Sequence, residues 1–272
     1  MYFIFTFKIR LNYVQITFKL RFIFTFKICF QNTFYIRVHL KIQITNLIYR
    51  LIVYSNCDMR NLNFIVGSWL TIHSLLCGYQ MYNLATTITT GTVSTIKTVV
   101  CIGSSLYLAD LFSGVLHVYF DNRKYDLKQN TVLDKIAYSF QTHHEDPQSF
   151  IRNSPFYNPQ GQIDILMYLS TPVYSLTTLG HYVYPNTPSL FLILYTFNLV
   201  ATYSQILHGL SHKNPKTLHP IIRVLQKYRI IIHPQDHRTH HKNYDKHFAI
   251  VNGWSNSLLN VFFNKLLKNY RF

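Results

Sequence analysis

The stretch LADLFSGVLHVYFD, residues 108–121, sets two acids and a histidine within an apolar run. Asp110, Gly114, His117 and Asp121 follow one another at intervals of four, three and four residues, so they share one face of a helix. An acid inside an apolar helix is costly and usually faces a protein or aqueous interior. We therefore expect Asp110 and Asp121 to orient neighbouring imidazoles of a catalytic site. The alternative for Asp110 is a carboxylate that reaches the membrane interface.

This stretch belongs to one of four apolar segments that approach the length of about 20 residues needed to cross a bilayer. The chain has 272 residues, 49% of them hydrophobic, and the apolar residues lie in blocks rather than in short alternations. This distribution predicts an all-α integral membrane protein with about four transmembrane helices. The four segments are Leu62–Tyr79, Thr98–Phe120, Ile163–Tyr184 and Ser189–Leu210.

The charge pattern predicts the orientation of these segments. The formal net charge is +16, and the basic residues mainly flank apolar runs without any nucleic-acid motif, so we expect no nucleic-acid partner. Most Lys and Arg of the organised part lie in Asp121–Gln162 and His212–Phe272, which places both segments and both termini in the cytosol. The four cysteines form no CxxC pair, which argues against a disulfide framework or a zinc ribbon.

The first 58 residues differ from the rest of the chain. They contain eight Lys and Arg and a single acid, and FIFTFKI occurs at both Phe3–Ile9 and Phe22–Ile28. This low-complexity, basic stretch does not have the pattern of a secretory signal. We interpret residues 1–58 as an extension that activity does not need, with Met59 as a plausible alternative start, and residues 59–272 as the membrane-embedded domain.

Eight histidines between residues 117 and 241 are the candidate metal ligands. They are His117, His143, His144, His208, His212, His237, His240 and His241. The predicted topology brings all of them to the cytosolic face, whereas His73 and His181 fall within or at the far end of spans.

Each histidine motif alone is a weak signal. Adjacent His143 and His144 at a helix end can address two neighbouring metals, and Asp146 can orient an imidazole. The spacing of His208 and His212 places both on one side of a helix, although such a pair is as often involved in packing as in metal binding. In the tail, the i, i+3, i+4 spacing of His237, His240 and His241 predicts that three imidazoles converge.

The number of histidines predicts the kind of metal site. Eight imidazoles exceed the four ligands of a structural zinc ion and suit two metals with positions left open for oxygen. Because zinc has no redox chemistry, iron is favoured. We therefore expect two iron ions and O2 as a co-substrate.

Over about Tyr107–Phe262 the chain resembles the Kua lipid-desaturase family. The resemblance rests on ADxxSGxxHxxxD at Ala109–Asp121, HHxDP at His143–Pro147, HxxSH at His208–His212, HxxHH at His237–His241 and NGW at Asn252–Trp254. It implies that the eight histidines hold a di-iron centre that introduces a double bond into a membrane lipid. At Val118 and Asp236 the chain differs from the animal enzymes of this family. These differences concern the identity of the substrate more than metal binding.

The family has two branches with different substrates. One makes the vinyl-ether bond of plasmalogens from plasmanylethanolamine, and the other makes a trans double bond in the acyl chains of phosphatidylglycerol. The tail motif and NGW favour the ether-lipid branch. No GxGxxG loop is present, so the resemblance implies electrons from a membrane cytochrome or a ferredoxin. We expect a multi-pass protein of the endoplasmic reticulum.

Two other functions stay open at this point. A hydroxylase on the same metal centre would insert oxygen after a single hydrogen abstraction. A non-catalytic membrane anchor belongs to another class, but it would have no need of eight histidines at one membrane face.

Overall fold

The structure is a computed structural model that describes residues 2–11, 14–26, 36–39, 59–88, 92–128, 131–148 and 163–263. The chain divides into two units, Met1–Cys57 and Asp58–Phe272.

The first unit contains a three-stranded antiparallel sheet. Its strands are β1 (Tyr2–Leu11), β2 (Val14–Phe26) and β3 (Ile36–His39), in the order β1-β2-β3. Phe5 pairs with Leu20, and Phe24 pairs with Val38. Phe, Ile and Thr dominate these strands, and such aromatic and β-branched residues favour extended backbone. The expectation of an all-α chain therefore applies to the second unit, whose described residues form helices and connecting loops.

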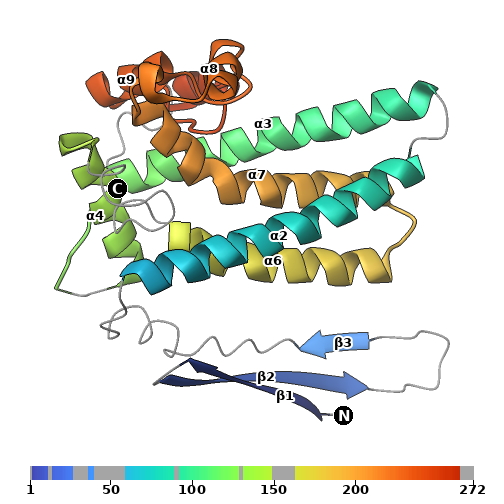
Figure 1. Ribbon diagram of the computed structural model, residues 1–272. Coiled ribbons are helices and arrows are strands. Elements are labelled where there is room, and N and C mark those ends of the chain that lie inside the picture. Colours follow the sequence, from blue (N-terminus) through green and yellow to red (C-terminus); the bar gives the residue numbers. More distant parts are fainter. Residues whose placement is uncertain are drawn as a thin grey trace. The chain divides into compact units, whose positions relative to one another are not determined.

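Four long helices form the body of the second unit (Figure 1). They are α2 (Met59–Ile88), α3 (Thr92–Asn122), α6 (Ile163–Val183) and α7 (Pro188–His212). Helix α7 packs against the other three. Each of the four predicted apolar segments falls on one of these helices. Among the described residues, Ser94–Asn122 and Pro188–His212 are long and apolar enough to cross a membrane.

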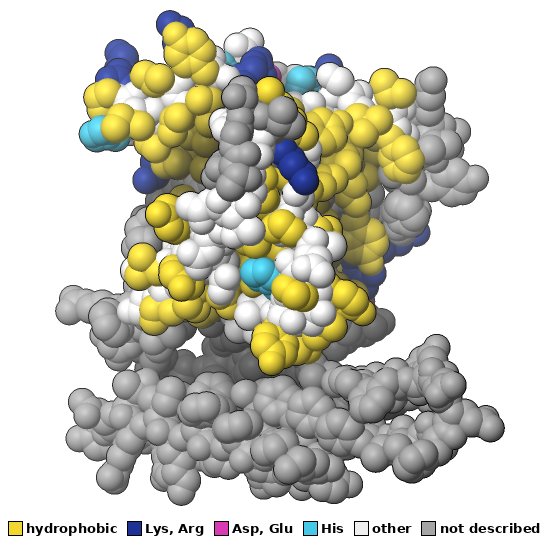
Figure 2. All heavy atoms as spheres, turned by 90° about the vertical axis from the view of Figure 1, so that its right-hand side faces the viewer, with side chains coloured by type: hydrophobic (Ala, Val, Ile, Leu, Met, Phe, Trp, Pro, Cys, Tyr) yellow, Lys and Arg dark blue, Asp and Glu magenta, His cyan; other side chains and the backbone are white. Residues whose placement is uncertain are grey.

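Large apolar side chains point outward along the long helices. Examples on α2 are Ile72, Leu75 and Leu76, and examples on α3 are Val99 and Val100, all of them exposed. Figure 2 shows the same pattern, with hydrophobic side chains over the body and much of the visible Lys and Arg toward the end that carries α8 and α9. Outward apolar faces of this extent are typical of helices that contact lipid.

Shorter helices gather at the end of the body where α3 and α7 finish (Figure 1). They are α4 (Val132–Glu145), the 3₁₀ turn η1 (Pro215–Thr217), α8 (Pro220–Lys227), α9 (Pro234–Lys242) and α10 (Asn256–Phe262). Proline occupies the first turn of both α8 and α9, where its missing N–H would have no partner in the helix. The preceding residues, His219 and His233, cap these helices by accepting a backbone N–H on Nδ1.

Two clusters of apolar side chains pack the shorter helices against α3. Phe120 of α3 packs with Ile136 and Ala137 of α4. Val118, on another face of α3, packs with Phe248, Ala249, Leu259 and Phe263. Because both clusters lie next to His117 in the sequence, they position α4 and the C-terminal segment around that histidine.

Candidate metal centre

Five imidazoles from three helices converge at the end of the helical body. They belong to His143 on α4, His208 and His212 on α7, and His237 and His241 on α9. His208 Nε2 lies 3.1 Å from His143 Nε2 and 2.7 Å from His237 Nε2. His237 Nε2 lies 2.9 Å from His212 Nε2 and 3.0 Å from His241 Nε2. A neutral imidazole is a donor at only one nitrogen, so one cation suits five converging Nε2 atoms better than mutual hydrogen bonds do.

A second group lies beside the first. It consists of His117 and Asp121 on α3, His144 on α4 and His240 on α9. Asp121 Oδ1 is 3.1 Å from His144 Nε2, and Asp121 Oδ2 is 3.2 Å from His240 Nε2 and 3.6 Å from His117 Nε2. The rings of His117 and His208, one from each group, have centroids 5.8 Å apart. The two groups are therefore neighbours.

Buried atoms of the second group support a cation there. His117 Nε2, His240 Nε2 and Asp121 Oδ2 are buried and have no hydrogen-bond partner among the described residues, although they face one another. A buried polar atom without a partner costs free energy. A metal ion between these three atoms would satisfy them all, so the donor set fits a bound cation.

Helical spacing explains how the histidines divide between the groups. His208 and His212, like His237 and His241, lie one turn apart and point the same way. His240 points about 100° away from His241 and joins the other group, so the three tail imidazoles do not meet at one point as the spacing had predicted. His143 and His144 divide in the same way, one to each group, as the sequence allowed.

Hydrogen bonds on the far side of two rings orient their Nε2 atoms. His208 Nδ1 lies 3.2 Å from Gln205 Oε1, and His240 Nδ1 lies 2.9 Å from the backbone oxygen of Lys246. Because both partners are oxygen acceptors, Nδ1 carries the proton and Nε2 presents its lone pair. Sequence reasoning missed both partners. Gln205 could have been found from its position one turn before His208, but the carbonyl of Lys246 leaves no signal.

Three imidazoles outside the long helices, those of His143, His237 and His241, are held in the neutral form. Burial, followed by the charge of neighbouring imidazoles, holds the pKa of His143 and of His237 well below the usual range. The same causes lower the pKa of His241 to about 2. A neutral imidazole is the form that binds a metal, so these side chains are ready to act as ligands at physiological pH.

The three acids predicted to orient imidazoles occupy different places. Asp121 lies directly within the second group. Asp146 is the C-cap residue of α4, where its backbone N–H donates to the Thr142 carbonyl, and it lies in neither group. Asp110 requires a correction, because the hydrogen bonds of its carboxylate go to a loop and not to an imidazole.

Asp110 is fully buried and holds the loop formed by residues 250–255. Its Oδ1 accepts hydrogen bonds from the backbone N–H groups of Val251, Asn252 and Gly253, at 3.1, 2.8 and 3.0 Å. Its Oδ2 accepts from the backbone N–H and the hydroxyl of Ser255, at 2.9 and 2.7 Å. The Asp110 carboxylate, although it lies in an apolar helix, thus accepts five hydrogen bonds from a distant segment of the chain. Neither of the two roles expected for Asp110, orienting an imidazole or reaching the membrane interface, included these bonds.

Residues on either side of this loop contact α3 at Gly114, and the loop itself bonds to the segment just before α9. A Cβ at Gly114 would collide with Leu259 Cδ1 and would lie 3.3 Å from the backbone N and Cα of Ala249. The Ile232 N–H donates to the Val251 carbonyl at 2.7 Å, two residues before α9 begins. Along this face of α3, Asp110 and Gly114 therefore contact the C-terminal segment. His117 and Asp121, further along the same face, belong to the second group.

Other histidines lie outside both groups. His219 caps α8 and His233 caps α9. His247 adopts a left-handed backbone conformation, with φ of 60°. His73 of α2 stacks on Trp69 with ring centroids 4.8 Å apart.

The chain matches the family described as "Lipid desaturase domain" over residues 106–268, more than half of its length. No curated protein and no solved structure matches it significantly.

Proposed function

Because the chain belongs to the lipid desaturase domain family, we propose that it is an O2-dependent enzyme that forms the vinyl-ether bond of plasmalogens in an ether phospholipid. The reaction removes two hydrogens from adjacent carbons of the alkyl chain. O2 takes up these hydrogens together with two electrons and two protons, and two waters leave. The choice of the ether lipid is supported by the motif at His237–His241 and by Asn252–Trp254, which resemble the ether-lipid branch of the Kua family.

Two iron ions are the cofactor of this proposal. His143, His208, His212, His237 and His241 would hold one ion, and His117, Asp121, His144 and His240 the other. Bound iron supplies the capacity to activate O2 for removal of hydrogen from an unactivated C–H bond. The protein contributes buried Nε2 lone pairs, the negative charge of Asp121 and a shell that limits access of water.

The proposal places the enzyme in a membrane. Helices α2, α3, α6 and α7 would cross the bilayer of the endoplasmic reticulum, with both histidine groups at the cytosolic face. Electrons would come from a membrane cytochrome or a ferredoxin. Glycosylation acceptors inserted at Pro185–Pro188 and after His212 test this orientation, because only the first is expected to be modified.

The observation that carries the proposal is the pair of neighbouring imidazole groups inside the matched region. The test is lipid analysis of cells that lack their own desaturase and express this chain, combined with iron analysis of the purified protein. We expect an ether lipid that has lost two hydrogens, and about two iron ions per chain.

The outcomes separate this reaction from its competitors. A gain of one oxygen would identify a hydroxylase, and a double bond in phosphatidylglycerol would identify the acyl-chain branch. Iron well below one ion per chain after reconstitution, with no change in any lipid, would support a non-catalytic anchor and overturn the proposal.

A further inference from the structure

Helix α8 carries an apolar stripe on the outside of the molecule. Ile221, Val224 and Tyr228 form this stripe at intervals of three and four residues, along α8 and its C-cap, and are 61%, 50% and 66% exposed. Gln226, nearly opposite the stripe at about 100° per residue, is buried and donates to the Leu210 carbonyl at 3.3 Å. A helix at a water-exposed surface has the reverse arrangement, with its apolar face on the core. The stripe on α8 therefore suits an apolar surrounding outside the chain.

The bond to Leu210 fixes α8 beside the last turn of α7. Leu210 lies two residues before α7 ends at His212, and α7 is long and apolar enough to cross a membrane. In the proposed membrane placement, this end of α7 lies where hydrocarbon gives way to the headgroups. Helix α8 therefore lies at the level of the bilayer surface.

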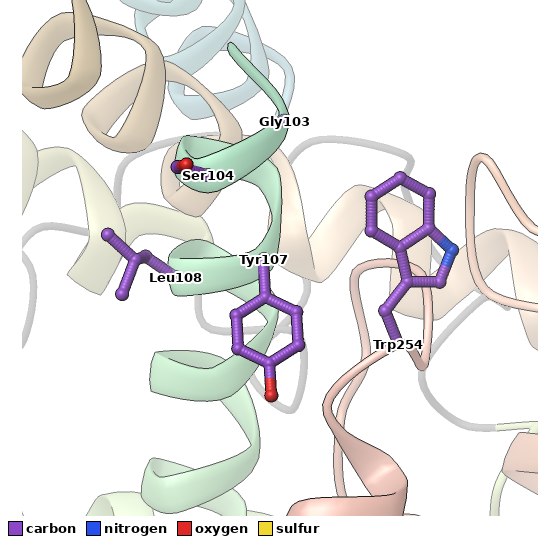
Figure 3. Close-up of a pocket in the computed structure, with 5 residues that line it drawn as sticks. All are labelled: Gly103, Ser104, Tyr107, Leu108 and Trp254. Atoms are coloured by element: carbon purple, nitrogen blue, oxygen red, sulfur yellow. The ribbon is translucent and has the colours of Figure 1, made fainter. Parts of the chain in front are cut away.

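The chain that follows α8 stays close to the spans as well. Trp254 lines a pocket together with Tyr107 of α3 (Figure 3). Tyr107 precedes His117 by ten residues, which is about 15 Å along a helix that rises about 1.5 Å per residue. The loop with Trp254 is bonded to the end of the segment between α8 and α9, because the Ile232 N–H donates to the Val251 carbonyl. The C-terminal part therefore extends along the middle of α3 and does not begin only beyond its end.

The direction of the apolar surface agrees with this level. Figure 2 views the molecule from the end of the body where α2 and α6 finish, and α8 and α9 lie at its top. Hydrophobic side chains are visible over this top part, next to Lys and Arg. A bilayer around the long helices would lie on the side that this view shows.

Cations border the apolar stripe. Residues 213–229 contain five Lys and Arg and no Asp or Glu. Arg223 and Lys227 lie one turn apart on α8 and are exposed, and the Lys227 ammonium is 5.7 Å from the centre of the Tyr228 ring. An apolar face bordered by Lys and Arg is typical of helices that lie in a membrane interface. The charge complements anionic headgroups.

We propose that α8 lies on the surface of the membrane that the body crosses, with the apolar stripe among the lipid chains and Arg223 and Lys227 against anionic headgroups. The inference rests on the membrane placement in the proposed function but not on its chemistry, since neither histidine group of the described residues includes a residue of α8. Through Leu210, α8 also ties the end of α7, with His208 and His212, to the membrane surface.

A light-activated cross-linker on the stripe tests this contact. The full chain carries p-benzoylphenylalanine in place of Tyr228 and is reconstituted in vesicles of phosphatidylcholine with one third phosphatidylserine. Mass spectrometry then identifies the adducts. The same cross-linker in place of Leu75, which is exposed on α2, reports lipid contact of the body. We expect lipid adducts at both positions.

The ratio of the two lipids in the adducts tests the role of the cations. At Tyr228 we expect phosphatidylserine to exceed its share of the vesicle by about fivefold for each cation near the surface. Arg223→Gln combined with Lys227→Gln should return the ratio to that of the vesicle. Lys124→Gln combined with Lys128→Gln is the matched control, because it removes the same charge from an exposed loop after α3 and should leave the ratio unchanged.

The outcomes separate α8 from the membrane placement itself. If the cross-linker at Leu75 forms no lipid adduct, the membrane placement fails and the inference fails with it. If Leu75 gives lipid adducts and Tyr228 gives none, or gives adducts with protein, the inference alone is wrong. A ratio at Tyr228 equal to that of the vesicle would overturn the assignment to anionic headgroups. Should the protein altered at Tyr228 fail to accumulate, Ile221 on the same stripe takes the cross-linker, and the same outcomes apply.

Discussion

Replacement of Asp110 by asparagine tests whether one buried carboxylate positions the C-terminal part of the histidine site. Asparagine keeps the size of the side chain and one acceptor oxygen. In the orientation that keeps the three hydrogen bonds to Oδ1, the new amide nitrogen faces the backbone N–H of Ser255, which is a donor, while the Ser255 hydroxyl can rotate to accept from the amide. One hydrogen bond to a charged group is lost, which contributes about 1.5–3 kcal/mol. We expect the free energy of unfolding to fall by about 1.5–3 kcal/mol.

The consequence should reach the metal site through the backbone. Val251 bonds to Asp110 through its N–H and to Ile232 through its carbonyl, so a displaced loop also displaces the start of α9. The variant should therefore hold less iron than the unmodified protein.

Chemical unfolding in detergent and iron analysis measure the two effects. Asp126→Asn is the control, because Asp126 is exposed and its carboxylate accepts a hydrogen bond from the backbone N–H of Lys128, two residues away. Its change in stability should stay within about 0.5 kcal/mol. If Asp110→Asn unfolds within about 1 kcal/mol of this control and keeps its iron, the positioning role is wrong.

Three further predictions address the ligands, the pH dependence and the N-terminal segment. His208→Ala and His240→Ala should each abolish turnover and lower bound iron, because each removes an Nε2 atom from one group. His219→Ala and His247→Ala should keep both, and iron loss in His247→Ala would add that residue to the ligands. The metal-free protein should lose about 4 kcal/mol of stability between pH 7.5 and pH 5.5. Folding keeps the buried imidazoles of His143, His237 and His241 neutral, whereas the unfolded chain takes up their protons below about pH 6.5. Thermal unfolding at the two pH values measures this loss, and an unchanged midpoint would contradict it. Finally, Met59–Phe272 should keep the lipid product of the full chain, and loss of activity despite normal membrane insertion would show that residues 1–58 are needed.

The sequence alone predicted the long helices and the end of the body at which the histidines gather. Long apolar runs predicted the helices α2, α3, α6 and α7, because burial or lipid contact of a continuous apolar segment is a local property of the chain. The topology of these segments also predicted that eight histidines come together at one end. Helical spacing also predicted that Asp110, Gly114, His117 and Asp121 share one face of a helix. All four residues lie on α3, at this spacing.

Only the tertiary structure decided how these residues are used. The division of the histidines into two groups depends on how α4, α7 and α9 cross, and side-chain spacing within one helix carries no information on such crossings. The role of Asp110 depends on a loop some 140 residues away in the sequence, whose backbone N–H groups look the same in any sequence. Contacts between distant backbone and side chains arise from packing, and packing is a property of the whole fold.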